Sequence, residues 1–164
     1  GGGVSTQANT VAERFAQKLG GYYRFLHLPD GLSGAAADEL ARLPQVREPL
    51  ELVRHADVFL YGVGRAMELA QRRGLSAAER DRLAQEGAVA EALGFYINAQ
   101  GRVVGGGSSL AIRPEDIGRK NRAAAVAAGR AKAEAILAVC AHHPHKLLVA
   151  DEGAALRMME LLRA

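Results

Sequence analysis

The sequence predicts an α/β fold in which one mostly parallel sheet carries helices on both faces. Short apolar runs, above all residues 57–61 (DVFLY) and 146–150 (KLLVA), have the length and composition of strands covered on both sides. Segments with helical periodicity lie between such runs, and a strand–helix–strand order is typical of parallel sheets with crossover helices. The 164 residues suit a single domain with a core of its own.

The first third of the chain predicts three helices and one strand. A helix is expected over residues 6–19, where apolar side chains recur every three or four residues before two glycines. Residues 22–28 (YYRFLHL) are short, aromatic-rich and bounded by turn residues, which favours a strand. Ser33 begins a short alanine-rich helix, and Pro44 begins another. The apolar positions of the first and last helices are Ala8, Val11, Ala12, Phe15 and Leu19, and Val46, Leu50 and Val53.

The middle of the chain predicts a turn, further helices and a hairpin. The glycines at 62–64 (GVG) are expected to form a tight turn from the preceding strand into a helix. A capping box at 76–79 (SAAE) marks the start of the next helix. Residues 93–98 (LGFYIN) and 102–104 (RVV) predict a β-hairpin with a glycine-containing turn. Pro114 begins a further short helix.

The alanine-rich tract AAAVAAGRAKAEAILAV has two interpretations. Helix propensity alone predicts one helix interrupted at Gly129. The alternative is a buried strand over 123–128, a turn at Gly129, and a helix from Ala131. We prefer the second, because the strand at 146–150 follows and the strand–helix–strand order then continues. Residues 151–162 (DEGAALRMMELL) predict a final helix.

Composition limits the classes of partner. The net charge is 21 − 18 = +3, which suits an anionic small molecule as well as nucleic acid. Cys140 is the only cysteine, so an internal disulfide is impossible and a reducing compartment is expected. No apolar run approaches a membrane span and no signal-peptide pattern begins the sequence, so no membrane partner and a cytoplasmic location are expected.

Two candidate ligand loops contain glycines. Ligands of open α/β sheets bind where the carboxyl ends of strands meet the starts of helices. At the start of the chain, Gly3, Ser5 and Thr6 could cradle an anion with backbone amides and hydroxyls, although an ordinary threonine cap explains them equally. The GVG segment at 62–64 resembles the beginning of a dinucleotide fingerprint, but Met67 stands where the third glycine would be. A nucleotide site is therefore not expected there.

Cations mark two further junctions. Arg72 and Arg73 end a predicted helix, where they either form a solvated pair or present one guanidinium to a phosphate. Lys132 lies in a first helical turn, against the helix-dipole preference, and this indicates an anionic partner. Asp151 and Glu152 at the start of the last helix are explained by capping alone.

Metal, cofactor and direct nucleic-acid sites are not expected. The run at 142–145 (HHPH) has no acidic or cysteine partner at ligand spacing, so a surface loop is favoured over a metal site. The basic run at 119–122 (RKNR) has no interleaved aromatic residue, and no helix-turn-helix pattern accompanies it.

Several segments together resemble one known family. They are QANTVAERFAQKLGGYYRFLHLPDGLS, PQVREPLELVRHADVFLYGVGRAMELAQRRGLS, GAVAEALGFYIN, AKAEAILAV and LLVADEGAA. In this order they are similar to the SorC/DeoR-type sugar-binding domain, the effector domain of bacterial transcriptional regulators. The resemblance implies a three-layer fold like those of ribose-5-phosphate isomerase, glucosamine-6-phosphate deaminase and the CoA transferases. It implies a phosphorylated sugar bound at the strand ends, no enzymatic activity, and DNA contact only through a separate helix-turn-helix domain.

The resemblance also assigns roles to five residues. It implies that Gln7 hydrogen-bonds the effector, and that Arg72 or Arg73 contacts phosphate or sugar oxygens. It implies that Glu91 accepts hydrogen bonds from sugar hydroxyls, and a carboxylate, which only accepts, suits a polyol. Lys132 is implied to neutralise a phosphate. No residue is expected to be catalytic.

The sequence departs from the family pattern at its start. Regulators of this family carry further strands upstream, with a glycine-threonine phosphate loop and an arginine-glycine turn. We therefore expect a single effector domain over 1–164 that lacks its first strands and the DNA-binding domain. Weak effector binding and a homo-oligomer formed through an uncovered edge are the expected consequences.

Two other functions remain as alternatives. The first is a phosphosugar isomerase or deaminase on the same fold, with Glu91, Asp151 or Glu152 as acid–base candidates. The second is a dimerisation domain that no longer binds a ligand. The effector domain is preferred because the sequence has no strong catalytic signature and fold alone does not determine function.

Overall fold

The computed structural model describes residues 8–26, 34–107, 110, 112, 114–117, 122–142 and 147–163. The strands are β1 (Val58–Arg65), β2 (Ala88–Ala92), β3 (Phe95–Asn98), β4 (Val103–Gly106), β5 (Arg122–Ala127) and β6 (Leu147–Ala150). The helices are α1 (Ala8–Leu19), α2 (Gly34–Arg42), α3 (Pro44–His55), α4 (Ala66–Arg72), α5 (Ala77–Gln85), α6 (Pro114–Ile117), α7 (Ala133–His142) and α8 (Glu152–Arg163), with the 3₁₀ turn η2 (Arg130–Lys132) before α7.

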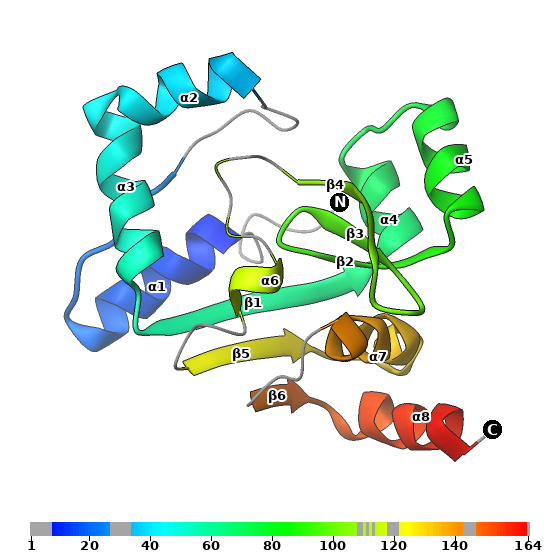
Figure 1. Cartoon of the computed structure of the whole chain (residues 1–164). Coiled ribbons are helices and arrows are strands. Elements are labelled where there is room, and N and C mark those ends of the chain that lie inside the picture. Colours follow the sequence, from blue (N-terminus) through cyan, green and yellow to red (C-terminus); the bar gives the residue numbers. More distant parts are fainter. Residues whose placement is uncertain are drawn as a thin grey trace.

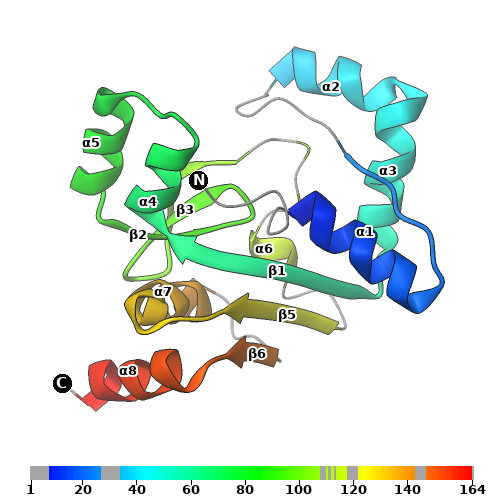
Figure 2. The ribbon, with the colours of Figure 1, turned by 180° about the vertical axis from the view of Figure 1, so that it is seen from behind.

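The six strands form one mixed sheet in the order β4-β3-β2-β1-β5-β6 (Figure 1). β1 pairs in parallel with β5 and β5 with β6, whereas β1 to β4 pair antiparallel in succession. The α/β class is confirmed, and the sheet is mixed rather than mostly parallel. In both views α1 and α3 lie near the start of β1 with α2 beyond α3, and α4, α7 and α8 lie near the ends of β1, β5 and β6 (Figures 1 and 2). In the described parts, no helix is long and apolar enough to cross a membrane.

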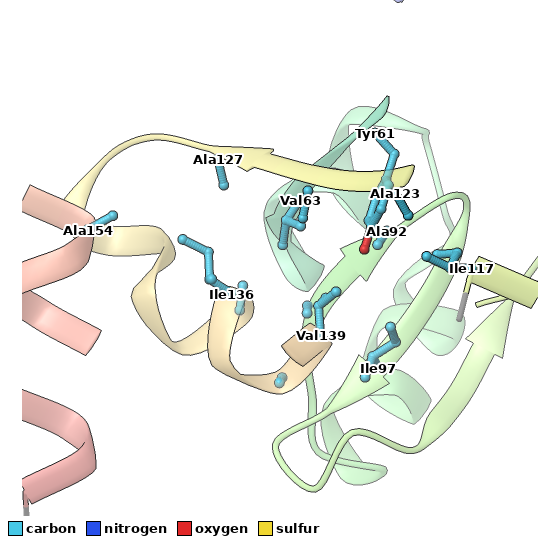
Figure 3. Packing of buried hydrophobic residues seen from close by; sticks show 14 residues of the cluster. Tyr61, Val63, Ala92, Ile97, Ile117, Ala123, Ala127, Ile136, Val139 and Ala154 are labelled. Carbon is cyan, nitrogen blue, oxygen red and sulfur yellow. The ribbon is translucent and has the colours of Figure 1, made fainter. Parts of the chain in front are cut away.

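The main core lies between one face of the sheet and α7. Tyr61 and Val63 of β1 and Ala123 of β5 belong to the same buried cluster as Ile136 and Val139 of α7 (Figure 3). α7 lies mainly over β2 and β1, where the small side chains of Ala90 and Ala92 let the helix approach closely, and the burial of apolar area there stabilises the fold. The alanine-rich tract is thus a strand followed by a helix, as preferred from the sequence.

The opposite face of β1, β5 and β6 is open. Its five large apolar side chains, which we call the open face, are 37 to 58% exposed and comprise Val58, Leu60, Val126, Leu147 and Val149. They gather because Leu60 and Leu147 both pair with Ala124, and Val126 pairs with Val149. Strand alternation places these five side chains on the face away from α7, where the small Ala124 between them is buried. The expectation that these strands are covered on both faces is therefore wrong within the described residues.

The glycines after Tyr61 lie inside β1 rather than in a turn. β1 continues through Gly62 and Gly64 to Arg65, so the turn predicted at 62–64 is wrong. A Cβ at Gly64 would collide with Cδ1 of Leu69, so glycine lets the Leu69 side chain of α4 pack directly on the strand. Gly64 therefore serves helix–strand contact, and α4 begins immediately after the strand.

The antiparallel half contains a strand that the sequence pattern did not predict. β2 has the sequence AVAEA, whose alanines carry no clear strand signal, yet all its residues are at least partly buried. The turn to β3 consists of Leu93 and Gly94, both with positive φ (58° and 87°), as in type I′ turns. The predicted hairpin is confirmed as β3 and β4, with Asn98 Oδ1 accepting the N–H groups of Gln100 and Arg102 in its turn.

Residues 21–26 form no strand, so the prediction over 22–28 is wrong for its described part. Tyr22 is 96% exposed, and Tyr23 stacks on Phe25 with ring centroids 4.8 Å apart. Aromatic composition favoured a strand, but β-propensity takes effect only where a neighbouring strand is available, and no described strand pairs with this segment.

The remaining helices lie where the sequence pattern predicts them. Their apolar sides are not all buried. Val46 and Leu50 of α3 are buried, and the capping box at the start of α5 is formed by Ser76 and Glu79. The apolar stripe of α1 is largely exposed, with Phe15 at 56%. Periodicity therefore located α1 correctly, although the described residues do not cover its apolar side.

Candidate functional site

The ends of β1, β5 and β6 meet the starts of helices at one end of the sheet (Figure 1). β5 leads through Gly129 into η2, and β6 leads through Asp151 into α8. On the other side of β1, α4 ends beside the β2–β3 turn. This end of the sheet brings together four of the residues predicted to bind an effector.

Arg73 and Glu91 form a partly buried ion pair. Arg73 Nη2 lies 2.9 Å from Glu91 Oε1, and the Glu91 side chain is only 7% exposed. The same oxygen accepts the N–H of Gly94 at 2.6 Å. A buried carboxylate is costly unless it is paired, so these donors stabilise Glu91 in its charged form. The contacts join the end of α4 to the β2–β3 turn.

Arg72, the last residue of α4, is exposed. Within the described part of the chain its guanidinium has no ion pair, whereas that of Arg73 is engaged by Glu91. Of the two neighbouring arginines, Arg72 therefore keeps its charge available for an outside partner.

The loop after β5 contains two cations in different situations. Arg130 Nη2 contacts both oxygens of Glu160, at 2.9 and 2.7 Å, and Glu160 also accepts a bond from Arg157. These arginines, Arg157 first and then Arg130, hold the pKa of the Glu160 carboxyl below its ordinary value. Lys132 is half-buried and makes no ion pair with another described residue. Lys132 is thus the available cation of this loop.

Asp151 connects the loops that follow β5 and β6. Its Oδ1 accepts the N–H of Ala154 at 2.9 Å and so caps α8, as expected. Its Oδ2 accepts the N–H of Gly129, also at 2.9 Å. The N–H groups of Gly129 and then Ala154 hold the pKa of the Asp151 carboxyl below its ordinary value. Capping alone therefore does not describe Asp151, because its second oxygen binds a loop 22 residues away in sequence. The sequence spacing gave no sign of this contact.

The two groups of charged residues lie on either side of β1. Glu91 of β2 pairs with Gly64, while Gly62, two residues earlier in β1, pairs with Val126 of β5. η2 lies beside β1 as well. The strands that carry Glu91 and lead to Lys132 are thus two strand spacings apart, about 10 Å.

Other predicted residues lie outside the described part. These are Gly3, Ser5, Thr6 and Gln7 of the N-terminal loop, His143 and His145 of the HHPH run, and Arg119 and Lys120 of the basic run. Among the residues that are described, no group of three or more histidine, cysteine or acidic side chains could hold a metal ion.

Comparison with known protein families identifies the family of this chain. The model of the family described as "Putative sugar-binding domain" matches residues 1–160. The chain belongs to this family, the sugar-binding domain of SorC-type transcriptional regulators. The family expected from the quoted segments is thereby confirmed.

Two curated relatives are, by name, regulators of central glycolytic genes. The chain is 37% identical to the central glycolytic genes regulator of Priestia megaterium over 155 residues, covering 94% of this chain and 45% of that protein. It is 37% identical to the regulator of the same name from Bacillus subtilis over 156 residues, covering 95% and 46% respectively. The chain thus spans about half the length of the curated relatives it matches. These relatives are transcriptional regulators and not enzymes.

Solved structures show the same fold. A SorC family transcriptional regulator from Enterococcus faecalis is 34% identical and superposes with a TM-score of 0.84, covering 96% of this chain and 64% of that one. The full-length sorbitol operon regulator SorC from Klebsiella pneumoniae has a TM-score of 0.79 at 17% identity, over 99% of this chain and 54% of that one. The second likeness concerns the fold alone.

Proposed function

We propose that this domain binds a phosphorylated sugar at the end of the sheet where β1, β5 and β6 finish. In the complete regulator, occupancy of this site alters DNA binding by a separate helix-turn-helix domain through a shift between conformations. The observation that carries the proposal is Lys132, a half-buried cation at the start of α7 with no ion pair among the described residues. The regulator names of the relatives agree with such a role.

Lys132 and Arg72 are the proposed phosphate contacts. A cation at a helix start is opposed by the helix dipole, and partial burial further disfavours an uncompensated charge. A phosphate placed between Lys132 and the backbone amides of the loop relieves both costs through charge-assisted hydrogen bonds. Arg72 is exposed and carries a guanidinium suited to a second contact with phosphate oxygens.

Glu91 and Arg73 are the proposed contacts for the sugar hydroxyls. Their ion pair holds an acceptor and a donor side by side near the β2–β3 turn. A polyol offers both donors and acceptors, so a fixed pair of this kind can recognise two adjacent hydroxyls. Gln7, with Gly3, Ser5 and Thr6, is proposed to complete the site from the N-terminal loop.

The proposed setting is a cytoplasmic regulator that works as a homo-oligomer. The family resemblance and the single reduced cysteine support this setting.

The proposal is tested by a thermal-shift screen of phosphorylated sugars against their unphosphorylated parents. A ligand at one hundred times its Kd stabilises the folded state by about 2.7 kcal/mol, which raises Tm measurably. We expect phosphorylated sugars to raise Tm and the parents not to do so. Lys132→Ala and Arg72→Ala should each reduce the shift, whereas Arg47→Ala should not, since Arg47 is an exposed cation on α3.

Two results would contradict the proposed function. One is an equal shift from a sugar phosphate and its parent sugar, which would mean that the phosphate is not recognised. The other is an unchanged shift in both Lys132→Ala and Arg72→Ala, which would place the ligand elsewhere or favour a dimerisation domain.

A further inference from the structure

The Asp151 carboxylate accepts hydrogen bonds from two parts of the chain, the start of α8 and the loop after β5. One oxygen caps α8 through the N–H of Ala154, and the other accepts the N–H of Gly129, which follows β5. A capping residue needs only the first of these bonds. The second bond crosses between loops that are far apart in sequence, so it fixes the loop after β5 relative to the start of α8.

The bond at Gly129 determines how η2 begins. Gly129 has a φ of +106°, a conformation that side chains other than glycine rarely adopt. No atom lies within 4 Å of the position a Cβ would take, so glycine is needed for its backbone conformation and not for space. The Gly129 carbonyl accepts the N–H of Lys132 at 2.9 Å. Gly129 is thus held at its N–H by Asp151 and at its carbonyl by Lys132.

The ion pair in the same loop, between Arg130 and Glu160, joins side chains and not the backbone. Arg130 contacts Glu160 through the end of its side chain, and both side chains are about half exposed (58 and 46%). Exposed pairs of this kind are screened by solvent and contribute little to structure. The Asp151–Gly129 bond is exposed as well, but it ends on the backbone and so restricts the chain itself, directly before the three-residue turn that ends at Lys132.

We infer that Asp151 is a positioning residue, which sets the place of Lys132 for an anionic ligand by fixing the backbone of Gly129. The inference rests on the proposed function, because Lys132 is the group that would touch the phosphate. Asp151 itself is not proposed to touch the ligand.

Asp151→Asn is the variant that tests the inference. Asparagine caps helices as well as aspartate, so α8 keeps its cap through Oδ1. Its amide nitrogen cannot accept the N–H of Gly129, so the second bond is lost. Glu160→Gln is the matched control, because it removes one negative charge from the same helix and leaves the Gly129 bond intact.

Two readouts separate positioning from a structural role. The affinities for inorganic phosphate and for glucose 6-phosphate are measured by NMR titration of the full chain. We expect about tenfold weaker binding of both probes by Asp151→Asn, because part of the binding free energy must then fix the backbone of Gly129, and less than about twofold weaker binding by Glu160→Gln. In Asp151→Asn alone, the Gly129 amide proton should move upfield and exchange faster, with Tm lower by only a few degrees, as the loss of one exposed hydrogen bond implies.

Each of the other outcomes contradicts either the inference alone or the proposed function as well. Unchanged affinity in Asp151→Asn, together with lost affinity in Lys132→Ala, would overturn the inference and leave the proposed function standing. Equal losses in Asp151→Asn and Glu160→Gln would overturn it by showing a general charge effect. If Lys132→Ala binds as the wild type does, or the wild type binds neither probe, the proposed function fails and the inference falls with it.

Discussion

At the scale of single residues, the residues predicted to contact an effector differ in whether they already form an ion pair. Arg73 and Glu91 are engaged with each other, whereas Arg72 and Lys132 have no ion pair within the described residues. The sequence alone placed all four near strand or helix ends, and the family resemblance named them. It could not distinguish Arg72 from Arg73, because that distinction depends on which guanidinium reaches the buried carboxylate.

Replacement of the buried carboxylate should be costly at this scale. We expect Glu91→Ala to lower the free energy of unfolding by about 3 kcal/mol, because Arg73 and the Gly94 N–H lose their shared acceptor in a partly buried place. Denaturant unfolding measures this change. Glu68→Ala on α4 is the control, since its weak contact with Arg65 at 4.0 Å is exposed, and it should cost less than about 0.5 kcal/mol. Equal effects would contradict a structural role for the Glu91 pair.

At the scale of elements, periodicity predicted most helices and the hairpin, and it failed where glycine or alanine carried the structure. β2 was missed because the side chains of AVAEA lack the branched and aromatic residues that mark strands. The turn predicted at 62–64 was wrong because glycine signals a turn and a close helix contact in the same way. Only the position of Leu69 in space distinguishes these two uses of Gly64.

The two glycines of β1 should therefore respond differently to substitution. We expect Gly64→Ala to lower the free energy of unfolding by about 2 kcal/mol, because its Cβ would overlap Leu69 and force α4 away from the strand. Gly62→Ala should cost much less, since the nearest atom to its Cβ is the Val126 carbonyl oxygen at 4.0 Å. Thermal unfolding of both variants measures the difference. The double variant Gly64→Ala/Leu69→Ala should show non-additive recovery, and full additivity would count against the overlap.

At the scale of the whole molecule, one face of the sheet packs on α7, and the other is covered by α4 and α5 over the antiparallel half but open over β1, β5 and β6. Sequence patterns could predict an α/β sheet, because apolar runs and helices alternate along the chain. They could not predict the open face, because a continuous apolar strand looks the same whether one side or both sides are covered. An exposed apolar surface made of neighbouring side chains on three strands favours association with another apolar surface.

The open face should be tolerant of polar side chains, and the covered face should not. We expect Leu60→Ser/Leu147→Ser to reduce binding of a hydrophobic dye and self-association in sedimentation velocity, with a small effect on stability, because both side chains are more than half exposed. Ile136→Ser on α7 is the matched contrast, since Ile136 is fully buried, and it should cost about 3 kcal/mol or more. If the double variant self-associates as the wild type does, contact between copies does not use the open face.

The pairing of β1 with β2 has a consequence for how the molecule opens. The registered pairing between them involves three residue pairs, 63 with 92, 64 with 91 and 65 with 90, whereas β1 and β5 are joined by five. The boundary between the parallel and antiparallel halves therefore has the shorter strand pairing, and α7, which contacts both β1 and β2, is the element that holds the two halves together. The Arg73–Glu91 pair lies at this boundary, with Glu91 in β2 and Arg73 at the end of α4. A sugar bound across it would join the two halves and slow hydrogen exchange in both, so that occupancy at one end of the sheet is felt through the whole domain.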